Sequence, residues 1–253
     1  MMISVRSLLL AATALFGFQL VAAEPVVVVQ IKAGSELWHA YAEPPRLSQL
    51  LAEVPHPEQQ YWPAAALYRQ SEHLQQQKQD LLSRLQRLEQ HWQLRNHTQN
   101  ILVLQSIRQQ VSGWQLAERQ AVRIDYDLAR ISQTANPRLD PGHYILRLAP
   151  RPEQVLFVGA IAEERGLLHQ GAASVHSYLK ALPSLQRTDP SWLYVVQANG
   201  QIQQVGRAYW NRQHLELQPG SQVFLPLHPR ILPKEFRSLN QELVQLVAHR
   251  ILL

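Results

Sequence analysis

Residues 192–205 read WLYVVQANGQIQQV, and this stretch decides the fold that the surrounding sequence predicts. The dipeptide Asn199-Gly200 is typical of a two-residue hairpin turn, because both residues tolerate the positive φ angles that such a turn requires. We therefore expect one strand over 192–197 and a returning strand over 201–205.

The residues on either side of this hairpin predict a small mixed domain over 151–230. Strands are expected over 155–161 and 166–170, and Ser174 is expected to cap a helix that Pro183 ends. Pro219-Gly220 then turns the chain into a strand over 223–227. Two strands, a helix and further strands follow one another as in a ubiquitin-like roll, the β-grasp fold.

The region 24–150 repeats this order. It opens with a β-branched run over 25–32 and an alternating strand over 36–41, and Pro55 ends a short helix that contains Leu47, Leu50 and Leu51. The stretch 122–131 is compatible with a strand, and another strand is expected over 144–148. The sequence therefore predicts an α+β protein with two copies of the β-grasp fold.

A helical hairpin over 64–112 is expected as an insertion in the first domain. A stripe of residues at heptad spacing is followed by a turn at 95–98 and by a second stripe, and the two stripes are expected to bury each other. The first stripe is Leu67, Leu74, Leu81, Leu85, Leu88 and Trp92, and the second is Ile101, Leu104, Ile107 and Val111.

The last segment, 231–253, predicts a C-terminal amphipathic helix. Three placements are open from the sequence alone. The helix packs on its own domains, pairs with a helix of a partner, or lies on a membrane surface.

The N-terminus predicts a cleavable signal peptide over 1–23, with Arg6 before an apolar core and Val21-Ala22-Ala23 before the expected cut. No Cys follows the core, so we expect a soluble periplasmic protein and not a lipoprotein. The net charge of +5 is mild, and no Lys/Arg run favours nucleic-acid binding.

Catalytic and metal-binding motifs are missing from the sequence. The chain has no Cys, and none of its 11 His stands at i, i+4 spacing beside a Glu, so we expect no metal and no cofactor. There is no Gly-x-Ser-x-Gly motif and no Gly-rich phosphate loop. Asp125-Tyr126-Asp127 is interpreted as a turn at the end of a strand. We expect no catalytic residues, although an enzyme remains an alternative.

Exposed aromatic residues could stack on sugar rings, and two of the six Trp are the better candidates. Trp62 lies at the junction between the first domain and the helical hairpin. Trp210 lies in a polar loop with Asn211 and His214. We take these four residues as candidate ligand-binding residues, and core packing is the expected role of most other Trp.

The chain resembles the GfcC family of periplasmic proteins, which are encoded with group 4 capsule and related exopolysaccharide systems. The resemblance covers essentially the whole chain after the signal peptide, and it rests on the order and spacing of short motifs. These are Trp62-Pro63, Ser106 to Gln110, Arg119, Ile124 to Asp127, Gly142 to Tyr144, Arg151-Pro152, Trp210 to His214, Pro219 to Gln222, Leu232 to Phe236, and Leu239-Asn240.

The resemblance implies two β-grasp domains, a helical insert and a C-terminal helix, in an order similar to part of the outer-membrane polysaccharide export channels. It also implies that Arg119 lies in a pocket, where it is a candidate ligand for an anionic group. This chain has Glu118 where the family usually has Gly, and an ion pair of Arg119 with Glu118 or Asp125 is the alternative.

We therefore expect a non-enzymatic accessory protein of capsule or exopolysaccharide assembly or export. It would bind polysaccharide or a component of the export machinery, with peripheral contact to outer-membrane export proteins through the C-terminal helix. The alternatives are a glycan-modifying enzyme and a purely structural adaptor that docks through its helices.

Overall fold

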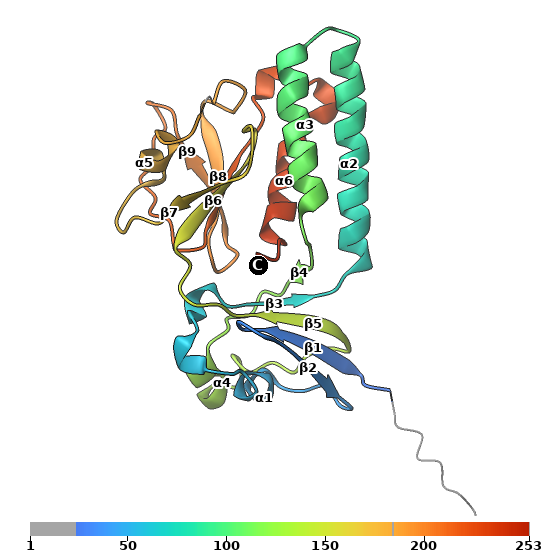
Figure 1. The fold of residues 1–253 in the computed structure, drawn as a ribbon, viewed down its shortest axis with the longest axis vertical. Coiled ribbons are helices and arrows are strands. Elements are labelled where there is room, and N and C mark those ends of the chain that lie inside the picture. The colour runs from blue at the N-terminus through green and yellow to red at the C-terminus, as the bar shows by residue number, and fades with distance from the viewer. Residues whose placement is uncertain (1–23, 184, 253) are drawn as a thin grey trace, which may run out of the picture.

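The computed structural model describes residues 24–183 and 185–252, so the predicted signal peptide lies outside the described residues. Two five-stranded sheets and six α-helices make up the described chain, which confirms the α+β class. Figure 1 shows the first sheet at the base of the molecule, with the second sheet and the helices α2, α3 and α6 above it.

The first sheet has the strand order β2-β1-β5-β3-β4. Strand β1 runs parallel to β5, and the other neighbours are antiparallel. Val27, Val29 and Ile31 of β1 are fully buried, because alternate side chains of a strand point to one face. That face is covered by α1 and α4. The elements are β1 (Val27–Lys32), β2 (Glu36–Tyr41), α1 (Leu47–Ala52), β3 (Ala66–Arg69), β4 (Glu118–Arg119), α4 (Tyr126–Ile131) and β5 (Gly142–Arg147).

The second sheet has the same arrangement, with the order β7-β6-β10-β8-β9 and a central parallel pair of β6 and β10. The predicted hairpin is confirmed, and Gly200 has the positive φ of 89° expected at its turn. This turn occupies the place that α2 and α3 take between β3 and β4 of the first sheet. The elements are β6 (Gln154–Gly159), β7 (Arg165–Leu168), α5 (Val175–Leu179), β8 (Trp192–Val196), β9 (Ile202–Gly206) and β10 (Gln222–Leu225).

Three expectations about local structure are wrong. Residues 126–131 form the helix α4 and not a strand, because the side chain of Asp125 accepts a hydrogen bond from the backbone N–H of Leu128 and caps the helix. Leu67 belongs to strand β3 and not to the helical stripe, and the helix starts only after Ser71, whose hydroxyl caps it at Leu74. The helix after Ser174 is also shorter than expected and ends at Leu179, and the side chain of Ser174 makes no capping hydrogen bond.

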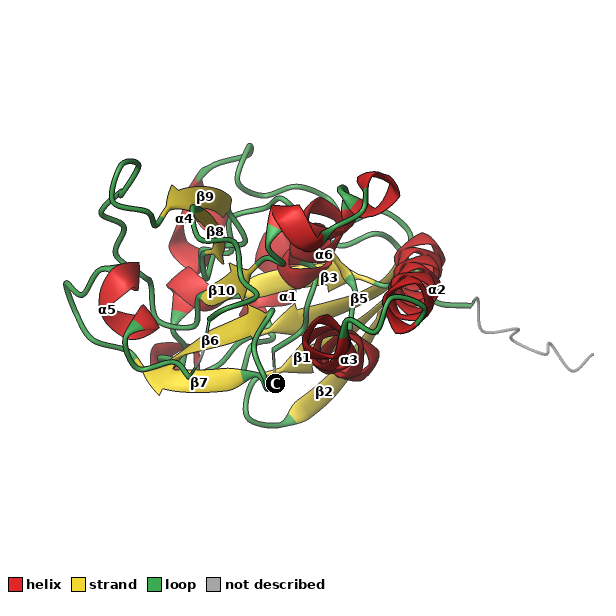
Figure 2. Ribbon diagram, turned by 90° about the horizontal axis from the view of Figure 1, so that it is seen from above, coloured by secondary structure: helices red, strands yellow, loops and turns green. Residues whose placement is uncertain are grey.

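The helical hairpin is confirmed as α2 (Glu72–Gln93) and α3 (Thr98–Gly113). Its stripes bury each other, but they also share one core with α6 (Leu239–Ala248) and with the second sheet. Phe224 of β10 and Val158 of β6 belong to this core. Figure 2 shows α2 and α3 side by side along one flank of the molecule.

The C-terminal segment packs on its own chain. Leu239, Leu243, Val244 and Val247 of α6 are fully buried between the second sheet and the helical hairpin. Among the three placements open from the sequence, the apolar stripe therefore takes the first. No helix among the described residues is long and apolar enough to cross a membrane.

Beyond α6 the chain continues as a short strap, residues 249–252, that lies against the first sheet. The N–H of Ala117 donates to the carbonyl of His249 at 3.1 Å, and the N–H of Ile251 donates to the carbonyl of Gln115 at 2.9 Å. The hydroxyl of Tyr68 donates to the carbonyl of Arg250 at 3.0 Å. The strap thus joins the end of α6, which packs on the second sheet, to β3 and to the segment that leads into β4.

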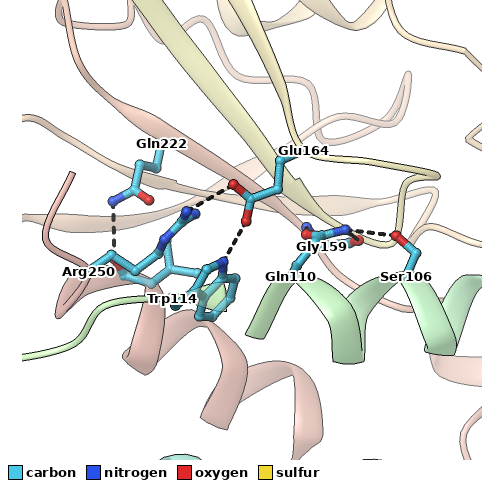
Figure 3. A network of polar contacts seen from close by, with 8 residues as sticks. Ser106, Gln110, Trp114, Gly159, Glu164, Gln222 and Arg250 are labelled. Atoms are coloured by element: carbon cyan, nitrogen blue, oxygen red, sulfur yellow. Dashed lines mark hydrogen bonds and ion pairs between the residues drawn. The ribbon is translucent and has the colours of Figure 1, made fainter. Parts of the chain in front are cut away.

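Helix α3 is tied to the second sheet by side-chain amides (Figure 3). Gln110 accepts from the N–H of Gly159 at 2.8 Å and donates to its carbonyl at 3.0 Å, in a buried environment. Gly159 has φ of 102°, and a Cβ there would lie 2.4 Å from the carbonyl oxygen of Leu225. Ser106 donates to the carbonyl of Ile161 at 2.7 Å. These contacts fix the helical hairpin on the end of β6.

Leu243→Ala tests whether α6 belongs to the protein's own core. Because Leu243 is fully buried, we expect the free energy of unfolding to fall by about 2–5 kcal/mol, measured by urea denaturation. The matched control is Leu102→Ala on α3, where the leucine is 55% exposed and little change is expected. Equal stability of the two variants would show that α6 does not contribute to the core.

Gln110→Ala tests the tie between α3 and β6. The substitution leaves the buried N–H of Gly159 without an acceptor, which costs about 1–3 kcal/mol of unfolding free energy. Gln109→Ala is the control, because Gln109 is the exposed neighbour on the same helix. Denaturation curves that coincide for the two variants would contradict this assignment.

Candidate functional site

Arg119, the predicted pocket arginine, lies where the two sheets meet. Its Nη2 donates to the carbonyl of Ala198 at 2.6 Å, and its guanidinium carbon lies 5.7 Å from the centre of the Tyr68 ring. Burial lowers the pKa of Arg119, and the neighbouring Tyr68 opposes that shift. A Cβ on Gly200 would lie 2.5 Å from Nε of Arg119, so a side chain at position 200 would force the Arg119 side chain to shift.

The alternative ion pairs of Arg119 are not formed in the part of the chain that the structure describes. Glu118 is exposed, and no ion pair joins it to Arg119. Asp125 pairs instead with Arg123 at 2.9 Å and caps α4. The charge of Arg119 is therefore met by a backbone carbonyl and an aromatic ring, and not by a carboxylate.

Trp62 lies in a 3₁₀ turn, Trp62–Ala64, and is partly buried. Its indole N–H donates to the carbonyl of Pro57 at 3.2 Å, which holds the ring in place. The ring lines a pocket of about 540 Å³ together with Asp125, Asn199 and Gln218. Because Asn199 belongs to the turn that adjoins Arg119, Trp62 and Arg119 both lie near the same turn.

Trp210 lies in the loop 207–214, which follows β9, and its side chain is 72% exposed. The neighbouring Tyr209 is fully exposed. Trp210 contacts Trp192 edge to face, with 6.3 Å between ring centres. We name Tyr209 and Trp210 the aromatic platform.

Asn211 holds this loop rather than offering free polar groups. Its side-chain amide donates to the carbonyl of Ser191 at 3.0 Å and accepts from the N–H of Ala208 at 2.9 Å. His214 is exposed and lies 3.6 Å from Glu216. Of the two residues, His214 is thus the one whose side chain remains open to solvent.

The predicted ligand-binding residues do not form one site. Trp62 and Arg119 adjoin the turn Asn199-Gly200, whereas Trp210 packs on Trp192 at the far end of the same hairpin, where Trp192 pairs with Gly206. The hairpin of β8 and β9 therefore separates two regions that the sequence does not distinguish.

Sequence reasoning missed the network of Trp114, Glu164 and Arg250 (Figure 3). One carboxylate oxygen of Glu164 accepts from the indole N–H of Trp114 at 2.5 Å, and the other accepts from Nη2 of Arg250 at 2.9 Å. The Arg250 guanidinium lies over the Trp114 ring at 4.6 Å. The three residues are far apart in the sequence and share no motif, so no local pattern could have joined them.

Among the described residues, no cluster of three or more His, Asp or Glu could hold a metal ion. His249 is instead a structural acceptor, because its Nδ1 accepts the backbone N–H of Arg119 at 3.0 Å. Burial lowers the pKa of His249, Glu118 raises it, and Arg119 lowers it further.

The lowered pKa of His249 predicts loss of stability in acid. Between the folded pKa and the ordinary value near 6.5, the unfolded chain binds more protons, so the free energy of unfolding falls as the pH drops through that window. In His249→Asn, urea denaturation from pH 7 to pH 5 should show a shallower dependence on pH. His73→Asn, at an exposed position on α2, serves as control, and equal slopes for wild type and His249→Asn would refute the prediction.

Comparison with known proteins identifies relatives of both halves of the chain. Residues 23–151 match the family model described as capsule biosynthesis GfcC, N-terminal, and residues 165–252 match the model described as capsule biosynthesis GfcC C-terminal. The uncharacterized protein YjbG of Escherichia coli (strain K12) is 30% identical over 148 residues, which are 58% of this chain and 60% of that relative.

The alignment thus spans less than two thirds of that relative's length. The two family models together extend over the first sheet, the helical hairpin, α6 and the second sheet except β6, which lies between the two matches. The chain belongs to the GfcC family of capsule biosynthesis proteins.

Proposed function

We propose that this protein is a non-enzymatic periplasmic accessory component of capsule or exopolysaccharide assembly, and that it binds glycan. Membership of a capsule biosynthesis family supports the proposed role in capsule or exopolysaccharide assembly. The observation that carries the binding role is the aromatic platform, which exposes two large rings on a loop that hydrogen bonds hold in place.

The platform has the properties of a preorganised binding surface. The Asn211 contacts fix the loop from within, and the backbone N–H of Gln213 donates to the carbonyl of Gly206 at 3.1 Å, which closes it. The edge-to-face contact with Trp192 fixes the ring of Trp210, which nevertheless remains largely exposed. A fixed aromatic ring loses little conformational entropy on binding and offers apolar area to the C–H side of a pyranose.

Hydrolysis is the less supported role. A glycosidase needs two carboxyl groups about 5–10 Å apart in a cleft. The pocket beside Trp62 is lined by one carboxylate, Asp125, which already caps α4 and pairs with Arg123. These contacts favour a structural role for Asp125.

We also infer that each sheet is a β-grasp domain and that α2 and α3 are an insertion in the first. The shared strand order and the shared central parallel pair support this inference. The apolar stripe of α6 is buried, so a contact with outer-membrane export proteins through this helix would use its exposed polar residues, such as Gln241 and Gln245.

Arg119 as a ligand for an anionic group stays a prediction. Its guanidinium is mostly buried and bonded to Ala198, so a ligand would have to reach it beside the turn Asn199-Gly200. Arg119→Ala should weaken binding of acidic glycans only, provided that thermal melting shows the variant to be folded.

The main test is calorimetric titration of purified neutral and acidic capsule fragments into wild type and Trp210→Ala. We expect binding in the variant to be about two- to tenfold weaker, because loss of an aromatic stack is worth about 0.5–1.5 kcal/mol. Trp38→Ala is the matched control, since Trp38 is 62% exposed on β2 and lies outside the platform. If Trp210→Ala binds as tightly as wild type, the platform is not the glycan site.

A further inference from the structure

A second pocket opens where the strap 249–252 crosses between the two sheets. It measures about 540 Å³, and its walls come from the end of α3, the end of β5, the start of β6 and the strap. The lining groups used below are Arg147, Arg250, Glu153, Gln154 and Ser221. Neither Arg119 nor the aromatic platform belongs to this pocket.

Arg250 brings an incompletely satisfied cation to this pocket. Its side chain is 9% exposed, and Nη2 is bonded to Glu164 at 2.9 Å. Nη1 is buried and has no hydrogen-bond partner among the described residues. The contact with Glu164 therefore leaves part of the hydrogen-bonding capacity of Arg250 unused. A buried guanidinium donor without an acceptor costs free energy.

Arg147 brings a second cation to the same pocket. Its Nε donates to the carbonyl of Leu252, which fixes the guanidinium beside the strap. Burial lowers the pKa of Arg147, Tyr68 opposes the shift, and the nearby Arg119 adds to it. Burial likewise lowers the pKa of Arg250, against the effect of Glu164. Both cations have thus lost hydration that the contacts made inside the protein do not fully replace.

Two carboxylates offset this charge, namely Glu164, which is bonded to Arg250, and Glu153 at the rim. Glu153 is exposed, lines the same pocket, and forms no ion pair with either arginine within the described chain. Because it faces solvent, its charge is better screened than the charges of the two arginines. Because Arg250 is paired with Glu164 and the charge of Glu153 is screened, the pocket favours a ligand with one negative charge at the inner wall. Neutral polar groups of the ligand would lie toward the opening.

We propose that this pocket binds the carboxylate of an acidic sugar residue, a hexuronate. The carboxylate would accept from the guanidinium of Arg147, a geometry that planar guanidinium groups favour, and the positive charge of Arg250 beside it would add electrostatic attraction. The exposed Gln154 would meet a sugar hydroxyl, whereas Ser221 is fully buried, donates to Gln197 and only forms part of the wall. A volume of about 540 Å³ lies within the range of small-ligand pockets.

The choice of a sugar acid rests on the proposed glycan binding, but the site is separate from the aromatic platform. The probes are D-glucuronate, neutral D-glucose and inorganic phosphate, added to the full chain. The readout is the indole N–H resonances in ¹⁵N-labelled protein, since the indole of Trp114 is bonded to the same Glu164 that pairs with Arg250.

We expect D-glucuronate to shift the Trp114 resonance and D-glucose to leave it unchanged. Arg147→Gln should weaken glucuronate binding at least tenfold, and Glu153→Gln should tighten it severalfold by removing a repulsive charge. Arg151→Gln is the matched control, because Arg151 is an exposed arginine nearby that does not line the pocket. Arg250 is left intact, because its replacement would leave Glu164 without its cation.

Three results would overturn the proposal. These are no response to glucuronate in the wild type, equal affinities of wild type and Arg147→Gln, and phosphate binding that matches glucuronate binding. The outcome is distinguishable from failure of the aromatic platform, because Trp210→Ala should leave the response to glucuronate unchanged.

Discussion

The strap formed by residues 249–252 is the contact on which the rest of the structure depends. It follows α6, whose apolar side chains lie in the core shared by the second sheet and the helical hairpin. It then pairs with residues 115–117, next to β4 of the first sheet. Because one short segment is held by both halves, the halves cannot move apart without breaking its hydrogen bonds and exposing the end of α6. The contacts of Ser106 and Gln110 with the end of β6 brace the same junction from the side of α3.

This junction explains why arginines gather there without an equal number of carboxylates. Arg119, Arg147 and the strap residue Arg250 lie near Tyr68. One backbone carbonyl accepts from Arg119 and another accepts from Arg147. Carbonyl groups orient a guanidinium but do not neutralise it, so burial at the junction leaves residual positive charge. Of these three arginines, only Arg250 has a carboxylate partner among the described residues, namely Glu164. The same contacts that fasten the two halves thus also create a site that favours anions.

The sequence predicted the elements whose signals are local. The β-branched run of β1, the dipeptide Asn199-Gly200 and the stripes of α2 and α3 each act within a few residues, and all three are confirmed. Helix α4 was missed because a single side chain, Asp125, decides it against a strand-like pattern. The Trp114–Glu164–Arg250 network could not be predicted, since its members meet only after the strap has crossed between the sheets. The candidate residues Trp62, Arg119 and Trp210 were each chosen on their own. Their spacing in the sequence does not show that Trp62 and Arg119 lie at one end of the hairpin of β8 and β9 and Trp210 at the other.

That hairpin fixes the position of the aromatic platform relative to the region around Arg119. The turn of β8 and β9 is held by Arg119 at the junction, and its other end carries Trp192, on which Trp210 packs. With a rise of about 3.3 Å per residue, the six steps from Trp192 to Ala198 span about 20 Å. A paired hairpin held at both ends keeps this distance fixed. The aromatic platform and the region around Arg119 therefore do not contact each other directly. Any cooperation between them must come from one glycan chain long enough to touch both, for which the second contact forms at a high effective concentration. Such an arrangement selects for chain length as well as for sugar chemistry, and neither region could make that selection alone.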